Sequence, residues 1–326
     1  MAFVPLPSPW HPRQVVSQRR SETSVLDRGG TVLAGRYRVR ELLGVGAMGS
    51  VWLAEHIVLR RMVVVKFHEE SFAGANAKTA RARFMRESRT LSAVRHRNVT
   101  ELFEVGRTPA GEPYLILELL QGETLARRLT RERSMSVDDA LHVAIEICRG
   151  LEAVHGAGVL HRDIKPENIF LHECEGELVP KLLDFGLARP IEARERLTWT
   201  GSAVGTPGYM APEQARGSSD LDARTDLFSL GVTLYEMLSG ELPFAGETMS
   251  DLLRAAVSED PIPLVAWRPD LAGPLAEAVQ TALAHRPSDR FTDAREMRLA
   301  LTAISRRTRQ SERPRSRRAL PTPPYR

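Results

Sequence analysis

Apolar and polar residues alternate along the first part of the chain, which is the pattern of β-strands that bury one face. The alternation is clear at Tyr37 and Val39, and it resumes at Val51 and Leu53 after a stretch rich in glycine. Residues 62–65, Met-Val-Val-Val, form a short apolar run typical of a buried strand. Two further strands are predicted at 102–105 and 114–119. This region therefore predicts a sheet of several strands.

A helical period replaces this alternation between about Ala77 and Val94. Phe84, Leu91 and Val94 recur at helical spacing, so they share one face of the predicted helix. Glu87 lies on that same face, and a buried carboxylate without a partner is costly. The pattern therefore favours a cation opposite Glu87, although a carboxylate that reaches the edge of the helix is the alternative.

Helices dominate from residue 136 onward. Ser136 is a predicted N-cap, and Asp138 and Asp139 follow in the first turn. The apolar stripe of this helix consists of Leu141, Ala144, Ile145, Cys148, Leu151 and Val154. Because Cys148 is part of the stripe, we expect a buried, unreactive thiol. The pattern predicts an α+β fold with a small β-rich lobe, a connector near 118–125 and a larger helical lobe.

The positive charge of the chain is concentrated at its two ends. The 326 residues carry a net charge of +4, and 42% of them are hydrophobic, as in ordinary globular proteins. Residues 305–326 hold eight Arg and one Glu, and residues 1–35 hold four Arg and two acidic residues. The body, 36–304, therefore has a net charge of −5 and no electrostatic signature of a nucleic-acid partner.

Both ends lack hydrophobic periodicity and are rich in Pro, Ser or Arg. We expect residues 1–35 to form a disordered arm and 305–326 a basic, disordered tail. Docking of the tails to an acidic partner, or recognition of the PTPP stretch, is the alternative function for them.

The composition also indicates a cellular compartment. Only two cysteines are present, Cys148 and Cys174, too few for a disulfide scaffold and consistent with a reducing environment. No apolar run approaches the ~18 residues that a membrane span needs. We therefore expect a cytoplasmic protein that is not inserted in a membrane.

The stretch 44–51, Gly-Val-Gly-Ala-Met-Gly-Ser-Val, fits a glycine pattern shared by dinucleotide-binding turns and by loops that cover ATP. A dinucleotide site needs a helix after the third glycine and an acid about 20 residues later, a spacing that Glu69 and Glu70 satisfy. The residues after Gly49 alternate like a strand instead, which favours a strand–turn–strand whose backbone amides approach phosphate. Lys66 ends the following apolar strand and is a candidate phosphate-binding cation.

Three further motifs follow in order. Residues 161–168 read His-Arg-Asp-Ile-Lys-Pro-Glu-Asn, residues 184–186 read Asp-Phe-Gly, and residues 211–213 read Ala-Pro-Glu. With the glycine stretch and Lys66, this set of motifs resembles the eukaryotic-like (Hanks-type) protein kinases. Within that family it resembles the serine/threonine branch, and the sequence around the Ala-Pro-Glu motif resembles that of bacterial members. The resemblance covers 36–304 and implies the bilobal protein kinase fold, with a small β-rich N-lobe at about 36–117, a hinge at about 118–125 and a larger helical C-lobe at about 126–304.

The resemblance implies a role for each motif in phosphoryl transfer from Mg-ATP. Lys66 would bind the phosphates and be oriented by Glu87, while Asp184 and Asn168 would hold Mg²⁺, for which Mn²⁺ can substitute. Asp163 would accept the proton of the attacking hydroxyl, and Lys165 would place a cation at the transferring phosphate. The ATP-binding residues implied in this way are Leu43, Gly44, Val45, Gly46, Ala47, Met48, Gly49, Val51, Lys66, Glu118 and Leu120.

Two features refine the expected specificity. Lys165 and Thr206 fit the serine/threonine branch of the family, so the expected substrates are proteins with Ser or Thr acceptors. Leu117 would guard the back of the adenine pocket, in front of the hinge at 118–120. The chain departs from the family at Val64, where alanine is usual, and the larger side chain would either tighten the adenine pocket or be accommodated by a neighbour.

The segment between Gly186 and Ala211 resembles an activation loop. Thr198 and Thr200 are candidate phosphorylation sites, because a phosphate there could pair with Arg162 and Arg189. We expect autophosphorylation in trans through a transient homodimer. An ordinary polar loop is the alternative.

Two other functions compete with the signalling serine/threonine kinase that these motifs predict. A pseudokinase scaffold would lack one of the catalytic groups, whereas Lys66, Asp163 and Asp184 are all present. A small-molecule phosphotransferase of related fold, such as an antibiotic kinase, would lack the Ala-Pro-Glu motif that this chain carries.

Overall fold

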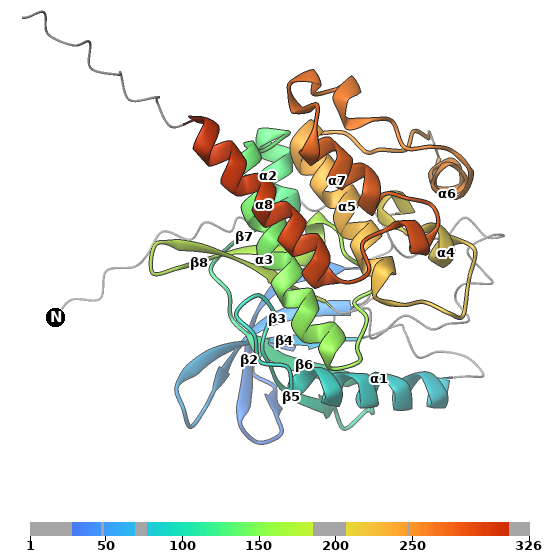
Figure 1. Cartoon of the computed structure of the whole chain (residues 1–326). Coiled ribbons are helices and arrows are strands. Elements are labelled where there is room, and N and C mark those ends of the chain that lie inside the picture. Colours follow the sequence, from blue (N-terminus) through green and yellow to red (C-terminus); the bar gives the residue numbers. More distant parts are fainter. Residues whose placement is uncertain (1–27, 47–48, 69–76, 185–206, 247, 313–326) are drawn as a thin grey trace, which may run out of the picture. The chain divides into compact units, whose positions relative to one another are not determined.

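The computed structural model describes residues 28–46, 49–68, 77–184, 207–246 and 248–312 (Figure 1). Its contacts divide the chain into two compact units. The described residues of the first unit are those within 28–124, 153–163 and 167–184, and those of the second lie within 125–152, 164–166 and 207–312. The first unit thus takes in more than the predicted N-lobe, and the predicted lobe boundaries stay predictions.

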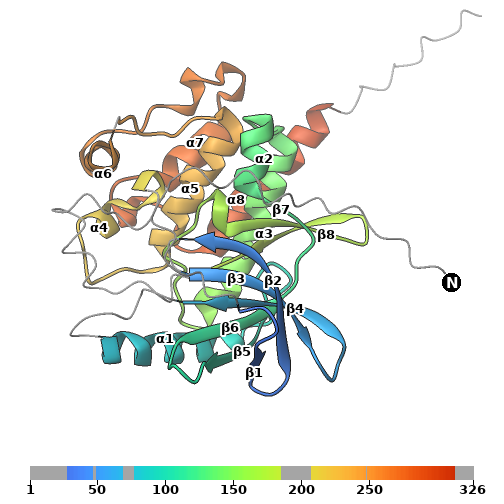
Figure 2. The ribbon, with the colours of Figure 1, turned by 180° about the vertical axis from the view of Figure 1, so that it is seen from behind.

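A six-stranded antiparallel sheet forms the larger part of the first unit. The strand order is β1-β2-β3-β4-β6-β5. The strands are β1 (Val32–Leu33), β2 (Tyr37–Gly46), β3 (Gly49–His56), β4 (Arg61–Phe67), β5 (Leu102–Arg107) and β6 (Pro113–Glu118). Helix α1 (Ala77–Ser92) contacts β5, as Figures 1 and 2 both show. The strands predicted from alternation are therefore present.

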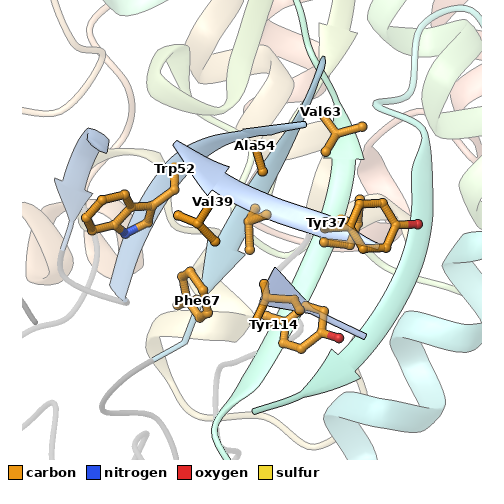
Figure 3. Packing of buried hydrophobic residues seen from close by; sticks show 10 residues of the cluster. Tyr37, Val39, Trp52, Ala54, Val63, Phe67 and Tyr114 are labelled. Carbon is orange, nitrogen blue, oxygen red and sulfur yellow. The ribbon is translucent and has the colours of Figure 1, made fainter. Parts of the chain in front are cut away.

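One face of this sheet holds a hydrophobic core cluster of the first unit (Figure 3). Trp52 lies opposite Val65, and Ala54 lies opposite Val63, so alternate residues of β3 and β4 point into the same cluster. All four side chains are at most 4% exposed. Burial of one such aliphatic side chain contributes about 1.5–3 kcal/mol to folding. Because successive side chains alternate across a sheet, the residues between them, including Lys66, belong to the opposite face.

A second, three-stranded sheet completes the first unit. Its strands are β7 (Gly122–Thr124), β8 (Ile169–Cys174) and β9 (Glu177–Leu182), in that order. Val99 forms an isolated parallel bridge with Leu182 of β9. The sequence analysis did not predict these strands. They bring the segment before Asp184 beside the chain that leads into β5.

The second unit is helical. Its helices are α2 (Leu125–Glu132), α3 (Val137–Gly156, whose last turn groups with the first unit), α4 (Pro212–Ala215), α5 (Ala223–Ser239), α6 (Met249–Ser258), α7 (Pro274–Ala282) and α8 (Ala294–Glu312). The Asp139 backbone N–H donates to the Ser136 hydroxyl, so the predicted N-cap of α3 is confirmed. Helix α5 is buried along most of its length and ends at Gly240, which has the left-handed φ of 75° typical of a C-cap. The α+β class is confirmed.

The N-terminal arm ends earlier than the sequence predicted, because part of 28–35 is ordered against the sheet. Arg28 donates two hydrogen bonds of 2.8 Å to the Glu112 carboxylate, and its guanidinium lies 4.0 Å above the Phe67 ring. Strand β1 then pairs with β2. A polar local sequence could not reveal this, since the partners of Arg28 are distant in the chain.

The C-terminal tail also begins later than residue 305, because α8 continues to Glu312. Met297 and Leu301 are fully buried, and Ile304 and Thr308 continue the same stripe as half-buried residues. This spacing keeps one face of the helix in contact with the protein beyond the predicted boundary. The prediction of disorder for 305–312 was therefore wrong.

Both cysteines are free thiols, with Cys148 buried and Cys174 exposed. Burial raises the pKa of Cys148 and keeps it protonated, as expected for an unreactive core thiol. Of the helices in the described ranges, none combines the length and the apolar character that crossing a membrane requires.

Candidate active site

The glycine stretch forms the end of an antiparallel hairpin. Gly44 pairs with Val51 and Gly46 pairs with Gly49, while Ala47 and Met48 at the turn lie outside the described residues. Gly49 has a φ of 137°, a backbone conformation that residues with a Cβ rarely adopt. Strand β3 follows Gly49 directly, so the helix that a dinucleotide site needs is replaced by a strand. The strand–turn–strand interpretation is confirmed.

The sheet face opposite the core carries the candidate nucleotide-binding residues. Lys66 lies opposite Val51, and Val64 lies opposite both Leu53 and Leu117. Partners that face each other across an antiparallel pair share one face. The sheet therefore presents Lys66 among aliphatic side chains, next to the strand that follows the glycine-rich hairpin. An aliphatic surface beside a cation suits a flat base linked to phosphates.

Lys66 forms an ion pair with the aspartate of the Asp-Phe-Gly motif. Its Nζ lies 2.5 Å from Asp184 Oδ1, and its side chain is 10% exposed. Burial alone would raise the pKa of Asp184, but the Lys66 ammonium outweighs it and holds that pKa below its usual range. Asp184 is thus an anion at neutral pH, as a ligand of Mg²⁺ must be.

Glu87 lies half-buried on α1, in the turn between the buried residues Phe84 and Leu91. Both apolar neighbours confirm the helical face that the sequence predicted. The pairing of Glu87 with Lys66 stays a prediction, because among the described residues Lys66 forms its ion pair with Asp184.

The His-Arg-Asp segment is tied to the segment before Asp184 by a short network. The His161 ring Nε2 lies 2.7 Å from the Leu183 carbonyl oxygen, and its Nδ1 accepts the Asp163 backbone N–H at 3.3 Å. One nitrogen accepts, so the hydrogen-bond pattern assigns the proton to Nε2. The Leu183 N–H donates to the Asn168 carbonyl at 2.8 Å. Both candidate metal ligands, Asn168 and Asp184, are therefore held beside the same backbone segment.

Asn168 connects the candidate base with the candidate metal site. Its Nδ2 donates to the Asp163 carbonyl at 2.7 Å and to Asp163 Oδ2 at 2.9 Å. This orientation leaves the amide Oδ1 as the oxygen that a cation could use. An amide oxygen beside the anionic Asp184 is the hard donor set that Mg²⁺ prefers, so these residues fit the metal.

Two residues of this segment have unusual backbone conformations. Arg162 has a φ of 63° and Asp184 a φ of 41°, both in the left-handed region that residues other than glycine rarely occupy. Such conformations cost of order 1–3 kcal/mol and concentrate at functional sites. Here the network around His161 and Asn168 holds them.

Two polar residues near the site were missed by the sequence analysis. Lys181 of β9 forms an ion pair of 2.7 Å with Glu118, the first residue of the predicted hinge. His68, two residues after Lys66, is 4% exposed and packs edge-on against Phe84 at 4.9 Å between ring centroids. A charged or titratable residue inside an apolar strand pattern was the signal available for each.

Other predicted residues belong to the second unit or lie outside the described residues. Arg290 donates to both Glu213 oxygens at 2.8 and 2.9 Å, so these two residues form a buried ion pair. Asp226 is fully buried, and Lys165 is half-buried. The activation-loop candidates fall outside the described residues: Thr198, Thr200, Thr206 and Arg189.

Comparison with known families decides the relationship. The model of the protein kinase domain matches residues 37–301. The chain belongs to the protein kinase domain family. The α+β architecture, with a β-rich N-lobe and a helical C-lobe, is the fold that the motifs predicted.

Bacterial serine/threonine kinases are among the relatives of this protein kinase. It is 38% identical over 276 residues to serine/threonine-protein kinase PknB of Mycobacterium tuberculosis, a match that covers 83% of this chain and 43% of that protein. It is 34% identical over 289 residues to serine/threonine-protein kinase pkn3 of Myxococcus xanthus, covering 87% of this chain and 52% of that protein. The chain thus spans about half the length of these relatives.

Proposed function

We propose that this protein kinase transfers the γ-phosphate of Mg-ATP to Ser or Thr hydroxyls of proteins. The observation that carries the proposal is the 2.5 Å ion pair between the buried Lys66 and Asp184, which is connected through Leu183 to the Asn168–Asp163 hydrogen bonds. One compact unit thus holds the three groups to which we assign phosphate binding, metal binding and the role of base: Lys66, Asp184 and Asp163. The names of the bacterial relatives support the choice of Ser and Thr as acceptors.

Each residue has a defined part in this transfer. The amides of the β2–β3 hairpin and the Lys66 ammonium bind the phosphates, and Asp163 orients the acceptor hydroxyl and receives its proton. The hydroxyl oxygen forms a bond to the γ-phosphorus while the bond from that phosphorus to the β–γ bridging oxygen breaks, and ADP leaves. Lys165 would stabilise the charge on the transferring phosphate. Asp184 and Asn168 would hold Mg²⁺, which would neutralise phosphate charge when bound.

The experiment is a transfer assay with [γ-³²P]ATP, the purified chain and a protein substrate such as myelin basic protein. We expect labelling of Ser and Thr that is lost in Asp163→Asn and in Lys66→Met. Loss of the base costs ~10²–10⁴-fold in rate. Labelling that persists in both variants would refute the site assignment, and a folded wild type that binds MgADP but labels no protein would favour a pseudokinase scaffold.

A small-molecule phosphotransferase is the second rival. The Ala211–Gln214 turn and the buried Glu213–Arg290 pair argue against it, because they organise the Ala-Pro-Glu motif that such enzymes lack. Label found only on a small acceptor, with no protein labelled, would support the rival.

We also propose that the kinase is activated by autophosphorylation in trans at Thr198 or Thr200, through a transient homodimer. The support is the Thr-x-Thr sequence before the Ala-Pro-Glu motif and the arginine of the His-Arg-Asp segment. Mass spectrometry of the 187–210 peptide after incubation with MgATP tests it. An unmodified peptide in active protein would contradict it.

The proposed location is the cytoplasm, where both free thiols would stay reduced. The proposed partners are proteins, because the basic residues gather at the ends of the chain and 36–304 has net negative charge. Fractionation of the native cells with an antibody to the chain tests the location, and recovery with membranes or outside the cell would contradict it.

A further inference from the structure

We propose that Lys181 is a positioning residue for nucleotide binding, acting through the Glu118 carboxylate on the hinge. The inference rests on the proposed function, because it assigns the 118–121 segment to the adenine end of the ATP site. Nothing in the sequence motifs points to Lys181, which lies in β9 three residues before Asp184.

The first step of the argument is the geometry around Glu118. Lys181 Nζ donates to Glu118 Oε1 at 2.7 Å, and the same oxygen accepts the Glu101 backbone N–H at 2.8 Å. The Glu118 N–H in turn donates to the Glu101 carbonyl at 3.0 Å. Main chain and side chain of Glu118 are therefore both fixed, at the point where β6 ends and the hinge begins.

The position of Lys181 is itself fixed from both sides. Asn98 Nδ2 donates to the Pro180 carbonyl at 2.8 Å, and Thr100 Oγ1 donates to the Leu182 carbonyl at 2.7 Å. The Leu182 N–H donates to the Asn98 carbonyl at 2.9 Å. These contacts hold the residues before and after Lys181, so its ammonium is presented to Glu118 from a rigid strand.

The far end of the hinge is also held. The Glu173 N–H donates to the Gln121 carbonyl at 2.9 Å, and His172 Nδ1 lies 3.1 Å from the Gln121 backbone nitrogen. The hinge is thus fastened at Glu118 and at Gln121, with Leu119 and Leu120 between the two anchors. Backbone groups of such a short span can meet a base edge only if both anchors keep their orientation.

The ion pair is poorly explained by stability alone. The side chains of Lys181 and Glu118 are only 11% and 16% exposed, and desolvation of two charges offsets most of their attraction. Apolar residues of similar size often serve stability as well as a buried pair does, whereas a pair imposes one orientation. Orientation is what the hinge requires, and the structure supplies it through Lys181.

The experiment compares Lys181→Met, Lys181→Arg, Glu118→Gln and the double variant Lys181→Met/Glu118→Gln in the full chain. MgADP binding is measured by titration calorimetry, and ATP KM and kcat by the transfer assay. We expect Lys181→Met to weaken MgADP binding and raise the ATP KM by about 5- to 10-fold, with kcat changed less than about 2-fold, as for residues coupled through contact. Lys181→Arg should restore binding to within about 2-fold, and the double variant should resemble the single ones.

Glu112→Gln is the matched control. Glu112 directly precedes β6 and Glu118 is its last residue, and the side chains of the Arg28–Glu112 pair have a similar exposure, 14% and 18%. Loss of the Arg28–Glu112 pair should leave the MgADP affinity unchanged. If Glu112→Gln weakened MgADP binding as much as Lys181→Met does, loss of any ion pair of the sheet would have the same effect, and the role assigned to Lys181 would be overturned.

Three results would overturn the role of Lys181: wild-type MgADP affinity in folded Lys181→Met, wild-type affinity in Glu118→Gln, or a fall in kcat with affinity unchanged. Glu118→Gln keeps the test decisive if Lys181→Met does not fold. A wild type that binds MgADP but phosphorylates no protein would refute the proposed function, while the affinities would still decide the role of Lys181.

Discussion

The buried histidine beside Lys66 predicts a pH-dependent stability. His68 lies between β4 and α1, its ring packs on Phe84, and neither ring nitrogen has a hydrogen-bond partner among the described residues. Burial, reinforced by the Lys66 ammonium and only partly opposed by Asp184, lowers the pKa of His68 from 6.5 to about 3. The folded protein therefore keeps this ring neutral throughout the mildly acidic range.

The sign and size of this pH dependence of stability follow from proton linkage. Between about pH 6.5 and 3 the unfolded chain binds a proton at His68 that the folded chain does not, so stability is greatest above this window and falls as pH falls through it. From about pH 7 to about pH 5 the loss due to His68 is about 2 kcal/mol. A folded pKa one unit higher would change this figure by less than about 0.1 kcal/mol, since pH 5 would still lie above that pKa.

The assay is chemical denaturation at the two pH values, followed through intrinsic tryptophan fluorescence, to which Trp52 in the core of the same sheet contributes. His68→Leu and His68→Gln carry no titrating ring, so each should lose about 2 kcal/mol less than the wild type on acidification. All other groups titrate in every variant and cancel in this comparison. Equal losses in wild type and both variants would refute the reasoning, because they would mean that His68 takes up a proton without unfolding.

Two further predictions concern stability. Arg290→Met leaves the buried Glu213 carboxylate without its cation, and it should lower the free energy of unfolding by about 3–5 kcal/mol in chemical denaturation. The control Arg254→Met removes an exposed ion pair and should lower it by less than about 1 kcal/mol. Equal losses in the two variants would contradict the role of burial. Gly49→Ala should lower the free energy of unfolding by about 1–3 kcal/mol in the same assay, because Gly49 has a positive φ. In the control Gly46→Ala the added Cβ would meet nothing within 4 Å, so the loss should be far smaller. Equal losses would show that the backbone conformation of Gly49 is not the cause.

Local patterns were enough to predict the sheet, α1 and the chemistry of the motifs. Alternation in β3 and β4 reports directly which side chains enter the core, and the buried Phe84 and Leu91 follow the helical period of α1. The hairpin at Gly49 was also predictable, because the residues after it alternate. In each case the physical cause, one buried face, acts within a few residues of the chain.

Pairings between distant segments were not predictable in the same way. The sequence pattern did not indicate the ion pair between Lys66 and Asp184, and the predicted pairing of Lys66 with Glu87 stays a prediction. The sequence did not indicate the partners of Arg28 and Lys181, because Glu112 and Glu118 are close to them only after the chain has folded. Periodicity records which face is buried, but it does not record which charges meet there.

The hydrogen bonds of the His161 imidazole explain how the strained backbone at the candidate site is held. His161 accepts from the Asp163 backbone and contacts the Leu183 carbonyl, so it spans the two segments that carry the candidate base and the candidate metal ligand. Arg162 and Asp184, the residues with positive φ, adjoin those two contacts. Relaxation of either backbone would break a hydrogen bond of a fully buried ring, which costs about 1–3 kcal/mol, comparable with the strain relieved. The network therefore holds both carboxylates in place before any nucleotide binds.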